Sequence, residues 1–370
     1  MNAITDVEGI RVGHCSDFEG GTGCTVILLD RGAPCGIDIR GSAAGTRQID
    51  ALGVAHVVEE VHAILLSGGS SFGLDATGGV MRYLEERQIG FDVGIARIPI
   101  VPTAVIFDLG FGDRRARPDA RMGYEACANA GAAVAEGSVG AGVGATVGKL
   151  FTVARAMKGG LGTASTALAD GTIVAALAVV NAFGDVLDHA TGRIMAGART
   201  SEDSLAFADT VACLKEGQVR RHFGLDNTTL AVVATNARLT KREATKVAQM
   251  SQGGLVKTIS PVHTTFDGDL VFALSLGEMK AEVNRIGVLG ELMVAEAIKN
   301  AVRKADGLGR LPAFKDIPGD RRDRSARSPK AGAGPPESRT PESLTARPHR
   351  SPGPPFRGRA RKERLSGNEP

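Results

Sequence analysis

The chain has 370 residues, 43% of them hydrophobic, which is enough to bury one large core or two ordinary ones. Its 13 Phe, 2 Tyr and no Trp argue against aromatic stacking on nucleic acid. The net charge of +3 comes from the tail, since residues 316–370 hold 13 Lys/Arg against 7 Asp/Glu, together with 10 of the 16 prolines. We predict a disordered basic tail at 316–370 after a single folded domain at 1–315.

Targeting and redox signals are absent from the sequence pattern. Residues 1–13 contain no apolar segment typical of a signal peptide, and no run of about 18 apolar residues occurs. The five cysteines form neither a CxxC pair nor a cluster with histidines. We therefore expect a cytoplasmic protein with no membrane or nucleic-acid partner, no disulfide framework, no metal and no cofactor.

The predicted elements alternate between strands and helices along the first 314 residues. Runs of Val, Ile and Leu predict strands at 25–29, 63–66, 104–109, 172–180, 230–235 and 270–274. Helical periodicity predicts helices at 74–87, 124–136, 201–215, 240–249 and 282–304, and Thr240 with Glu243 fits a capping box. This alternation predicts an α/β fold in the form of a layered sandwich, with helices outside a sheet core.

A glycine-rich segment at 137–148 precedes Lys149 and superficially resembles a nucleotide-binding loop. Val143 stands where a phosphate loop needs glycine, and Leu150 stands where it needs Ser or Thr. A dinucleotide fingerprint would need glycine at Ala145, after a strand and before a helix. We interpret the segment as a close-packed loop that presents Lys149, either as a site residue or as a solvated surface charge.

Two polar groups lie at the ends of apolar strands. Asn181 ends the predicted strand at 172–180, either as a turn residue or as an amide donor to an oxyanion. Asp267 and Asp269 flank Gly268 before the strand at 270–274, either as solvated carboxylates of a hairpin turn or as a pair that holds a nucleophile. The histidines His189, His222 and His263 are interpreted as structural, although His263 is near Asp267.

The step from Asn227 to Thr228 leads directly into the predicted strand at 230–235. Asn-Thr-Thr is typical of a turn and also matches the N-glycosylation pattern. If the chain were cut between Asn227 and Thr228, Thr228 would gain a free α-amine beside its hydroxyl, and so would carry a nucleophile and a base in one residue. The residues of this step alone do not decide between these interpretations.

Several ordered segments together resemble a family of self-processing aminopeptidases and amidases, the family of L-aminopeptidase D-Ala-esterase/amidase. The resemblance runs from Gly9 to about Phe314, and the Asn-Thr junction is nearest the branch of nylon-oligomer (6-aminohexanoate-oligomer) hydrolases. Its markers are the segments 9–14, 66–74, 143–149, 158–162, 179–181, 227–235 and 267–269. The basic tail is not part of the family pattern.

The resemblance implies an αββα sandwich of the N-terminal-nucleophile type, formed by a precursor that cuts itself into fragments 1–227 and 228–370. It implies that Thr228 is the nucleophile, that Asp267 and Asp269 orient it, and that Asn181 and Lys149 assist. The implied substrates are short peptides, amino-acid amides or 6-aminohexanoate oligomers, and the implied assembly is a homo-oligomer, a tetramer of processed protomers.

Two alternatives remain open on sequence. One is an acyltransferase of the ornithine acetyltransferase type, although Gly224-Leu225-Asp226-Asn227 stands where such enzymes carry Ala-Thr-Met-Leu. The other is an uncut, non-enzymatic binding protein.

Overall fold

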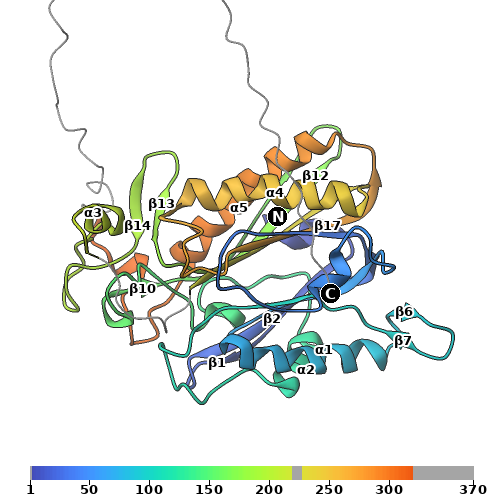
Figure 1. The fold of residues 1–370 in the computed structure, drawn as a ribbon, viewed down its shortest axis with the longest axis horizontal. Helices are drawn as coiled ribbons and strands as arrows, with labels where there is room; N and C mark the ends of the chain where they lie inside the picture. Colours follow the sequence, from blue (N-terminus) through green and yellow to red (C-terminus); the bar gives the residue numbers. More distant parts are fainter. Residues whose placement is uncertain (1, 219–226, 320–370) are drawn as a thin grey trace, which may run out of the picture. The chain divides into compact units, whose positions relative to one another are not determined.

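The computed structural model describes residues 2–218 and 227–319. Residues 320–370 of the predicted tail, and His222, lie outside these ranges. Two five-stranded sheets form the centre of the fold (Figure 1). Sheet A has the order β1 (Ile10–Asp17), β2 (Thr22–Ala33), β5 (Val61–Ser67), β8 (Thr103–Val105) and β4 (Gly45–Arg47). Sheet B has the order β11 (Gly160–Ala167), β12 (Ile173–Asn181), β15 (Thr228–Ala237), β17 (Leu270–Met279) and β3 (Cys35–Ile39).

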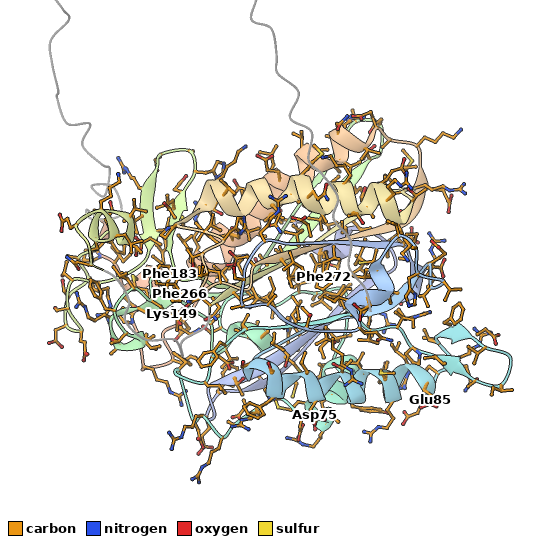
Figure 2. All side chains as sticks on the ribbon, viewed as in Figure 1. Asp75, Glu85, Lys149, Phe183, Phe266 and Phe272 are labelled. Atoms are coloured by element: carbon orange, nitrogen blue, oxygen red, sulfur yellow. The ribbon has the colours of Figure 1, made fainter. Side chains whose placement is uncertain are left out.

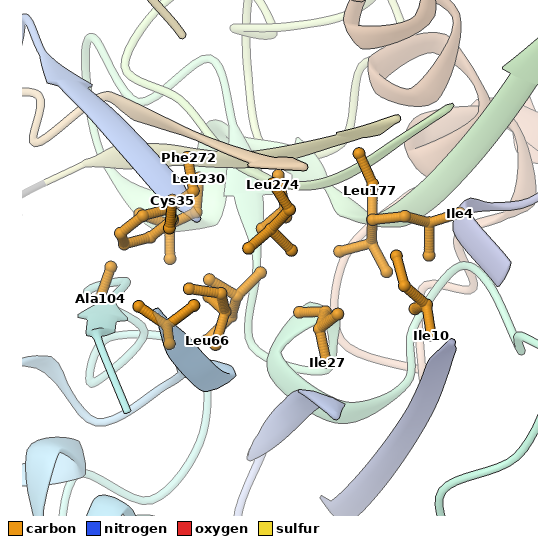
Figure 3. Packing of buried hydrophobic residues seen from close by; sticks show 14 of the residues in the cluster. Ile4, Ile10, Ile27, Cys35, Leu66, Ala104, Leu177, Leu230, Phe272 and Leu274 are labelled. Carbon is orange, nitrogen blue, oxygen red and sulfur yellow. The ribbon is translucent and has the colours of Figure 1, made fainter. Parts of the chain in front are cut away.

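Alternating apolar residues divide the core into three layers, because successive side chains of a strand face opposite sides of its sheet. Leu230, Val232 and Ala234 of β15 pack between the two sheets, whereas Ala231 and Val233 face the helices. Figure 3 shows the layer between the sheets, where Leu66 and Ile27 of sheet A face Leu177, Phe272 and Leu274 of sheet B.

Helices cover both outer faces. The helices α4 (Lys241–Thr258) and α5 (Val283–Lys304) pack on sheet B, and α1 (Ala76–Glu85) and α2 (Ala120–Ala128) pack on sheet A (Figure 1). The predicted layered α/β sandwich is therefore confirmed, in the αββα order. None of the helices in the described ranges is both long enough and apolar enough to cross a membrane.

Smaller elements complete the described ranges. A three-stranded sheet contains β13 (Asp185–Asp188), β14 (Arg193–Ala196) and β16 (Ile259–Ser260); two-stranded pairs are β9 (Thr146–Val147) with β10 (Met157–Lys158) and β6 (Phe91–Asp92) with β7 (Arg97–Ile98). The short helix α3 (Thr210–Lys215) follows β14, and a last 3-10 turn spans Phe314–Asp316. Ile317 is buried in the layer beneath α4 and α5.

Several predicted boundaries were wrong. The helix predicted at 201–215 is helical only from Thr210, because Asp209 caps it by accepting the Ala212 N–H. The helix predicted at 124–136 is α2, which starts earlier because Asp119 accepts the Met122 N–H, and which ends at Ala128. The strand predicted at 104–109 ends at Val105.

The hairpin predicted at Asp267-Gly268 does not exist. β17, which follows these residues, pairs in parallel with β15 and antiparallel with β3. A parallel neighbour cannot be reached through a tight turn, and α4 makes the crossover from β15. Asp267 itself forms a parallel bridge with Asn227. Asp267 and Gly268 thus lie directly before a central strand, at the same end of sheet B as Thr228.

Candidate active site

The antiparallel pairing of β12 and β15 places the end of one strand opposite the beginning of the other. Asn181, the last residue of β12, is the register partner of Thr228, the first residue of β15. Sheet B therefore brings together two residues that lie 47 positions apart in the sequence, at the end of the sheet where Asp267 and Gly268 also lie. The turn interpretation of both residues is wrong, since each is a buried end of a central strand.

All five predicted site residues are buried, with exposed fractions of 0% for Asn181, 1% for Asp267 and Asp269, 2% for Lys149 and 3% for Thr228. Buried polar side chains need hydrogen-bond partners, and carboxylates and ammonium groups need them most. A solvated surface role for Lys149, Asp267 or Asp269 is excluded by this burial. Figure 2 labels Lys149 beside Phe183 and Phe266, and these two rings lie 5.3 Å apart between centroids.

Lys149 and Asn181 form one hydrogen-bonded unit. The Lys149 Nζ donates to Asn181 Oδ1 at 2.7 Å and to the Asn181 main-chain oxygen at 3.0 Å. The Thr146 N–H also donates to Asn181 Oδ1, and Asn181 Nδ2 donates to the Phe107 carbonyl. These contacts fix which end of the amide carries the N–H groups, so Asn181 presents its nitrogen on the side of Phe107.

The glycine-rich segment provides the space for this unit. Gly148 has a φ of +74°, and a Cβ built there would lie 2.0 Å from the Ala198 nitrogen. The Gly148 and Lys149 N–H groups donate to the carbonyls of Gly184 and Phe183. Glycine at this position therefore lets the loop pack against the end of β12 and direct Lys149 inward, in agreement with the predicted close-packed loop.

The carbonyl oxygen of Asn227, in the peptide bond predicted to be cut, accepts two hydrogen bonds. The Thr228 hydroxyl donates to the Asn227 oxygen at 2.5 Å, and the Gly268 N–H donates to the same oxygen at 2.7 Å. The Asn227 N–H donates to the Phe266 carbonyl at 2.8 Å. The hydroxyl of Thr228 thus lies beside a carbonyl that is already polarised by a main-chain donor.

The two carboxylates bind different segments around the site. Asp269 Oδ1 accepts the Thr229 N–H at 2.6 Å, at the start of β15. Asp267 Oδ1 accepts the Phe183 N–H, and its Oδ2 accepts the Thr264 N–H and hydroxyl. Burial, reinforced by the nearby charge of Asp269, raises the pKa of Asp267 to about 6. Asp269 is thus bonded directly to the residue after Thr228, whereas Asp267 is bonded to Phe183 and Thr264.

The sequence interpretation missed three residues at this site. His263 contacts Asp269 with both its main-chain N–H and its ring Nδ1, each at 3.1 Å, so the purely structural assignment of His263 does not describe its position. Gly268 supplies the main-chain donor to Asn227, and Phe107 accepts from Asn181. The spacing of His263 from Asp269 within one loop was the available signal for the first; no local pattern marks the other two.

A small cavity borders the site beside Lys149. It is lined by Phe107, Asp108, Gly110, Phe111, Thr146, Lys149 and Val153. Asp108 accepts the Thr22 hydroxyl and the Gly69 N–H, and burial raises its pKa to about 6. Two other cavities lie at the opposite end of β17, around Leu276 and Glu278, far from the predicted chemistry.

Comparison with known proteins identifies relatives along most of the chain. The model of Peptidase family S58 matches residues 2–310. An uncharacterized aminopeptidase of Mycobacterium tuberculosis (strain ATCC 25618 / H37Rv) is 40% identical over 347 residues, covering 86% of this chain and 98% of the relative. The 6-aminohexanoate-oligomer endohydrolase of Agromyces sp. (strain KY5R) is 30% identical over 308 residues, covering 80% and 81%.

Solved structures show the same fold at low sequence identity. The L-aminopeptidase D-Ala-esterase/amidase of Ochrobactrum anthropi, described as a variant of the Ntn hydrolase fold, matches with a TM-score of 0.66 at 18% identity, covering 88% of this chain and 93% of the other. A Burkholderia sp. beta-aminopeptidase matches with a TM-score of 0.62 at 22% identity, covering 85% and 90%. The chain thus has the Ntn hydrolase fold, and it belongs to Peptidase family S58 as a hydrolase of the aminopeptidase and amidohydrolase class.

Proposed function

We propose that this hydrolase cuts itself between Asn227 and Thr228 and then uses Thr228 as an N-terminal nucleophile. The observation that carries the proposal is the geometry at Asn227, whose carbonyl oxygen accepts from both the Thr228 hydroxyl and the Gly268 N–H. The hydroxyl needs no large movement to reach the neighbouring carbonyl carbon. A donor already on the oxygen stabilises the negative charge that develops during attack.

In the processing step, the Thr228 Oγ1 forms an ester with the Asn227 carbonyl carbon, and the peptide C–N bond breaks. The Thr228 nitrogen takes up a proton and becomes a free amine. Water then hydrolyses the ester, so that Asn227 ends as a carboxylate and the Thr228 hydroxyl is regenerated. The products are the fragments 1–227 and 228–370, both derived from one catalytic domain at 1–315 with the tail 316–370 attached.

In turnover, the free α-amine of Thr228 accepts the proton of its own hydroxyl as Oγ1 attacks the substrate amide. An α-amine has a pKa of about 7.7 to 8.0, so a useful fraction is neutral near pH 7. The leaving amine takes the proton, and water releases the acyl group from Thr228. Asn181 would donate to the oxyanion, with Lys149 fixing its amide, while Asp267 and Asp269 would hold the segments around the new N-terminus.

For substrates, we propose amides of short peptides or amino acids with a free amino end, because the aminopeptidase relatives are the more similar ones. Linear 6-aminohexanoate oligomers are the second class, supported by the endohydrolase relatives and by the Asn-Thr junction. We further propose a cytoplasmic homo-oligomer, a tetramer of processed protomers.

The test is the mass and N-terminal sequence of the purified protein. We expect two fragments, the smaller one beginning at Thr228. The variant Thr228→Ala should remain a single chain, and Thr228→Ser, which keeps a hydroxyl, is the matched control that should still be cut. An uncut wild-type chain with full amidase activity would refute the mechanism.

Activity on a panel of substrates separates the proposed class from its alternative. Amino-acid p-nitroanilides, dipeptides and 6-aminohexanoate oligomers should be hydrolysed by the processed protein and not by Thr228→Ala. Acetyl transfer to ornithine in the absence of amide hydrolysis would instead indicate an acyltransferase.

A further inference from the structure

The loop before β17 brings an imidazole into the site. Residues 261–266 lead from β16 to Asp267, and His263 lies within this segment. His263 is 18% exposed at its side chain, whereas Asp269, which it contacts, is 1% exposed. A buried carboxylate is costly unless its oxygens receive hydrogen bonds or face a positive charge.

The contacts assign the proton on the ring. A carboxylate oxygen only accepts hydrogen bonds, so the His263 Nδ1 that lies 3.1 Å from Asp269 Oδ2 must carry hydrogen. The main-chain N–H of His263 donates to the same oxygen at 3.1 Å. The other ring nitrogen, Nε2, is buried and has no hydrogen-bond partner within residues 2–218 and 227–319.

The backbone of His263 is held in an uncommon conformation. Its φ is 55°, in the left-handed region that only a few per cent of residues other than glycine adopt, with Asn, Asp and His the most frequent among them. Such conformations persist where surrounding contacts enforce them, and they gather at functional sites. Here the left-handed turn directs both the N–H and the ring of His263 to one oxygen of Asp269.

Asp269 transmits this contact to the nucleophile. Its other oxygen, Oδ1, accepts the Thr229 N–H at 2.6 Å, next to Thr228. We propose that His263 is a positioning residue of the active site, whose ring N–H orients Asp269 so that Asp269 fixes the main chain at Thr229, directly after Thr228. The inference rests on the proposed nucleophile, and it adds an imidazole that acts only through Asp269.

The contact with His263 distinguishes Asp269 from its neighbouring carboxylate, Asp267. Asp267 and Asp269 are both buried, and the charge of Asp269 contributes to keeping Asp267 protonated to a higher pH. The two carboxylates have distinct partners, because Asp269 accepts from His263 and Thr229 while Asp267 accepts from Phe183 and Thr264. The two contacts from His263 to Oδ2 thereby orient the Asp269 carboxylate so that its Oδ1 faces the Thr229 N–H.

The test compares His263→Ala with His263→Asn. Asparagine tolerates the left-handed backbone and can place its side-chain N–H near the position of Nδ1, whereas alanine removes the donor. We expect His263→Ala to lower kcat at least tenfold with KM changed less than threefold, and to slow processing. His263→Asn should restore most of kcat, and His189→Asn, on the turn after β13, is the matched control that should leave kcat unchanged.

Two further measurements separate this inference from the proposed function. In the double variant His263→Ala with Asp269→Asn, kcat should equal that of Asp269→Asn alone, because the ring acts through that carboxylate. Three outcomes would overturn the inference while leaving Thr228 as nucleophile. They are a wild-type kcat in His263→Ala, an equal loss of kcat in His263→Ala and His263→Asn, and fully multiplicative losses of kcat in the double variant. An uncut, inactive wild-type chain would instead overturn the proposed function.

Discussion

Replacing Gly268 by alanine tests the close packing around the cleavage step. A Cβ at position 268 would lie 2.8 Å from Thr228 Oγ1, 2.8 Å from the Ala43 oxygen and 2.9 Å from the Ala44 Cα. Two of these three atoms belong to the main chain and cannot swing aside. Either they or residue 268 must shift by roughly half an ångström to reach ordinary contact distance. Such a shift also displaces the Gly268 N–H from the Asn227 oxygen, which it contacts at 2.7 Å.

The expected cost has two components. Overpacking of this kind destabilises a fold by about 1–3 kcal/mol, which corresponds to a fall in the unfolding midpoint of roughly 1.5–5 °C for a domain of this size. Because a misplacement of about 1 Å can cost a hundredfold in rate, half that shift should slow processing about tenfold. The assay is a time course of fragment formation on denaturing gels, with thermal unfolding followed by circular dichroism.

The matched control is Gly131→Ala, since a Cβ at Gly131 would meet nothing within 4 Å. This variant should process at the wild-type rate. If Gly268→Ala also processes at the wild-type rate and unfolds at the temperature of the control, the close approach of Gly268 to Thr228 would be refuted.

Two other predictions concern buried charges. Lys149→Met keeps the length of the side chain but removes both donations to Asn181. Processing and turnover, measured by fragment ratios and initial rates, should therefore fall about a hundredfold or more. The control Lys246→Met, at an exposed position of α4, should match wild type. Asp185 accepts from Ala198 and Thr210, and burial raises its pKa to about 6. Since this folded pKa is above the unfolded value, its stabilising contribution is complete below about pH 3.8 and is lost as pH rises through about 6. Denaturant unfolding in a Thr228→Ala background should therefore show a more positive slope of stability against pH between 4 and 6 for Asp185→Asn than for its parent, and identical slopes would contradict the burial of this charge.

Local signals predicted those elements whose ends are set by their own residues. The capping box of Thr240 and Glu243 forms as predicted and starts α4. The end predicted at Gln249 was wrong because α4 continues through Gly253 and Gly254 to Thr258. Isolated glycines weaken a helix, but a Cβ at Gly254 would lie 2.6 Å from the Glu291 oxygen. Close packing against α5 outweighs the local preference, and no short sequence window contains that contact.

In the active site, too, local sequence predicted the strand ends but not the contacts between strands. Asn181 and Thr228 could be recognised as strand ends, but their register depends on the pairing of β12 with β15. Asp267-Gly268 has the composition of a hairpin turn, and its position before a parallel strand is decided by the crossover through α4. The roles of His263 and Gly268 depend on distances across these pairings, which is why motif matching found the carboxylates and missed their partners.

The strand order of sheet B determines how the two proposed fragments are joined. β15 and β17 of the fragment 228–370 lie side by side in the middle of the sheet, with β12 on one side and β3 on the other, both from the fragment 1–227. Once the bond is cut, the shorter fragment is an inner piece of a sheet whose outer strands belong to the longer one. Separating them would break both ladders and open the core on both faces. Reassembly from denatured fragments would then be bimolecular and depend on concentration, whereas the precursor would fold as one chain. For the proposed maturation we therefore expect folding first and cutting second.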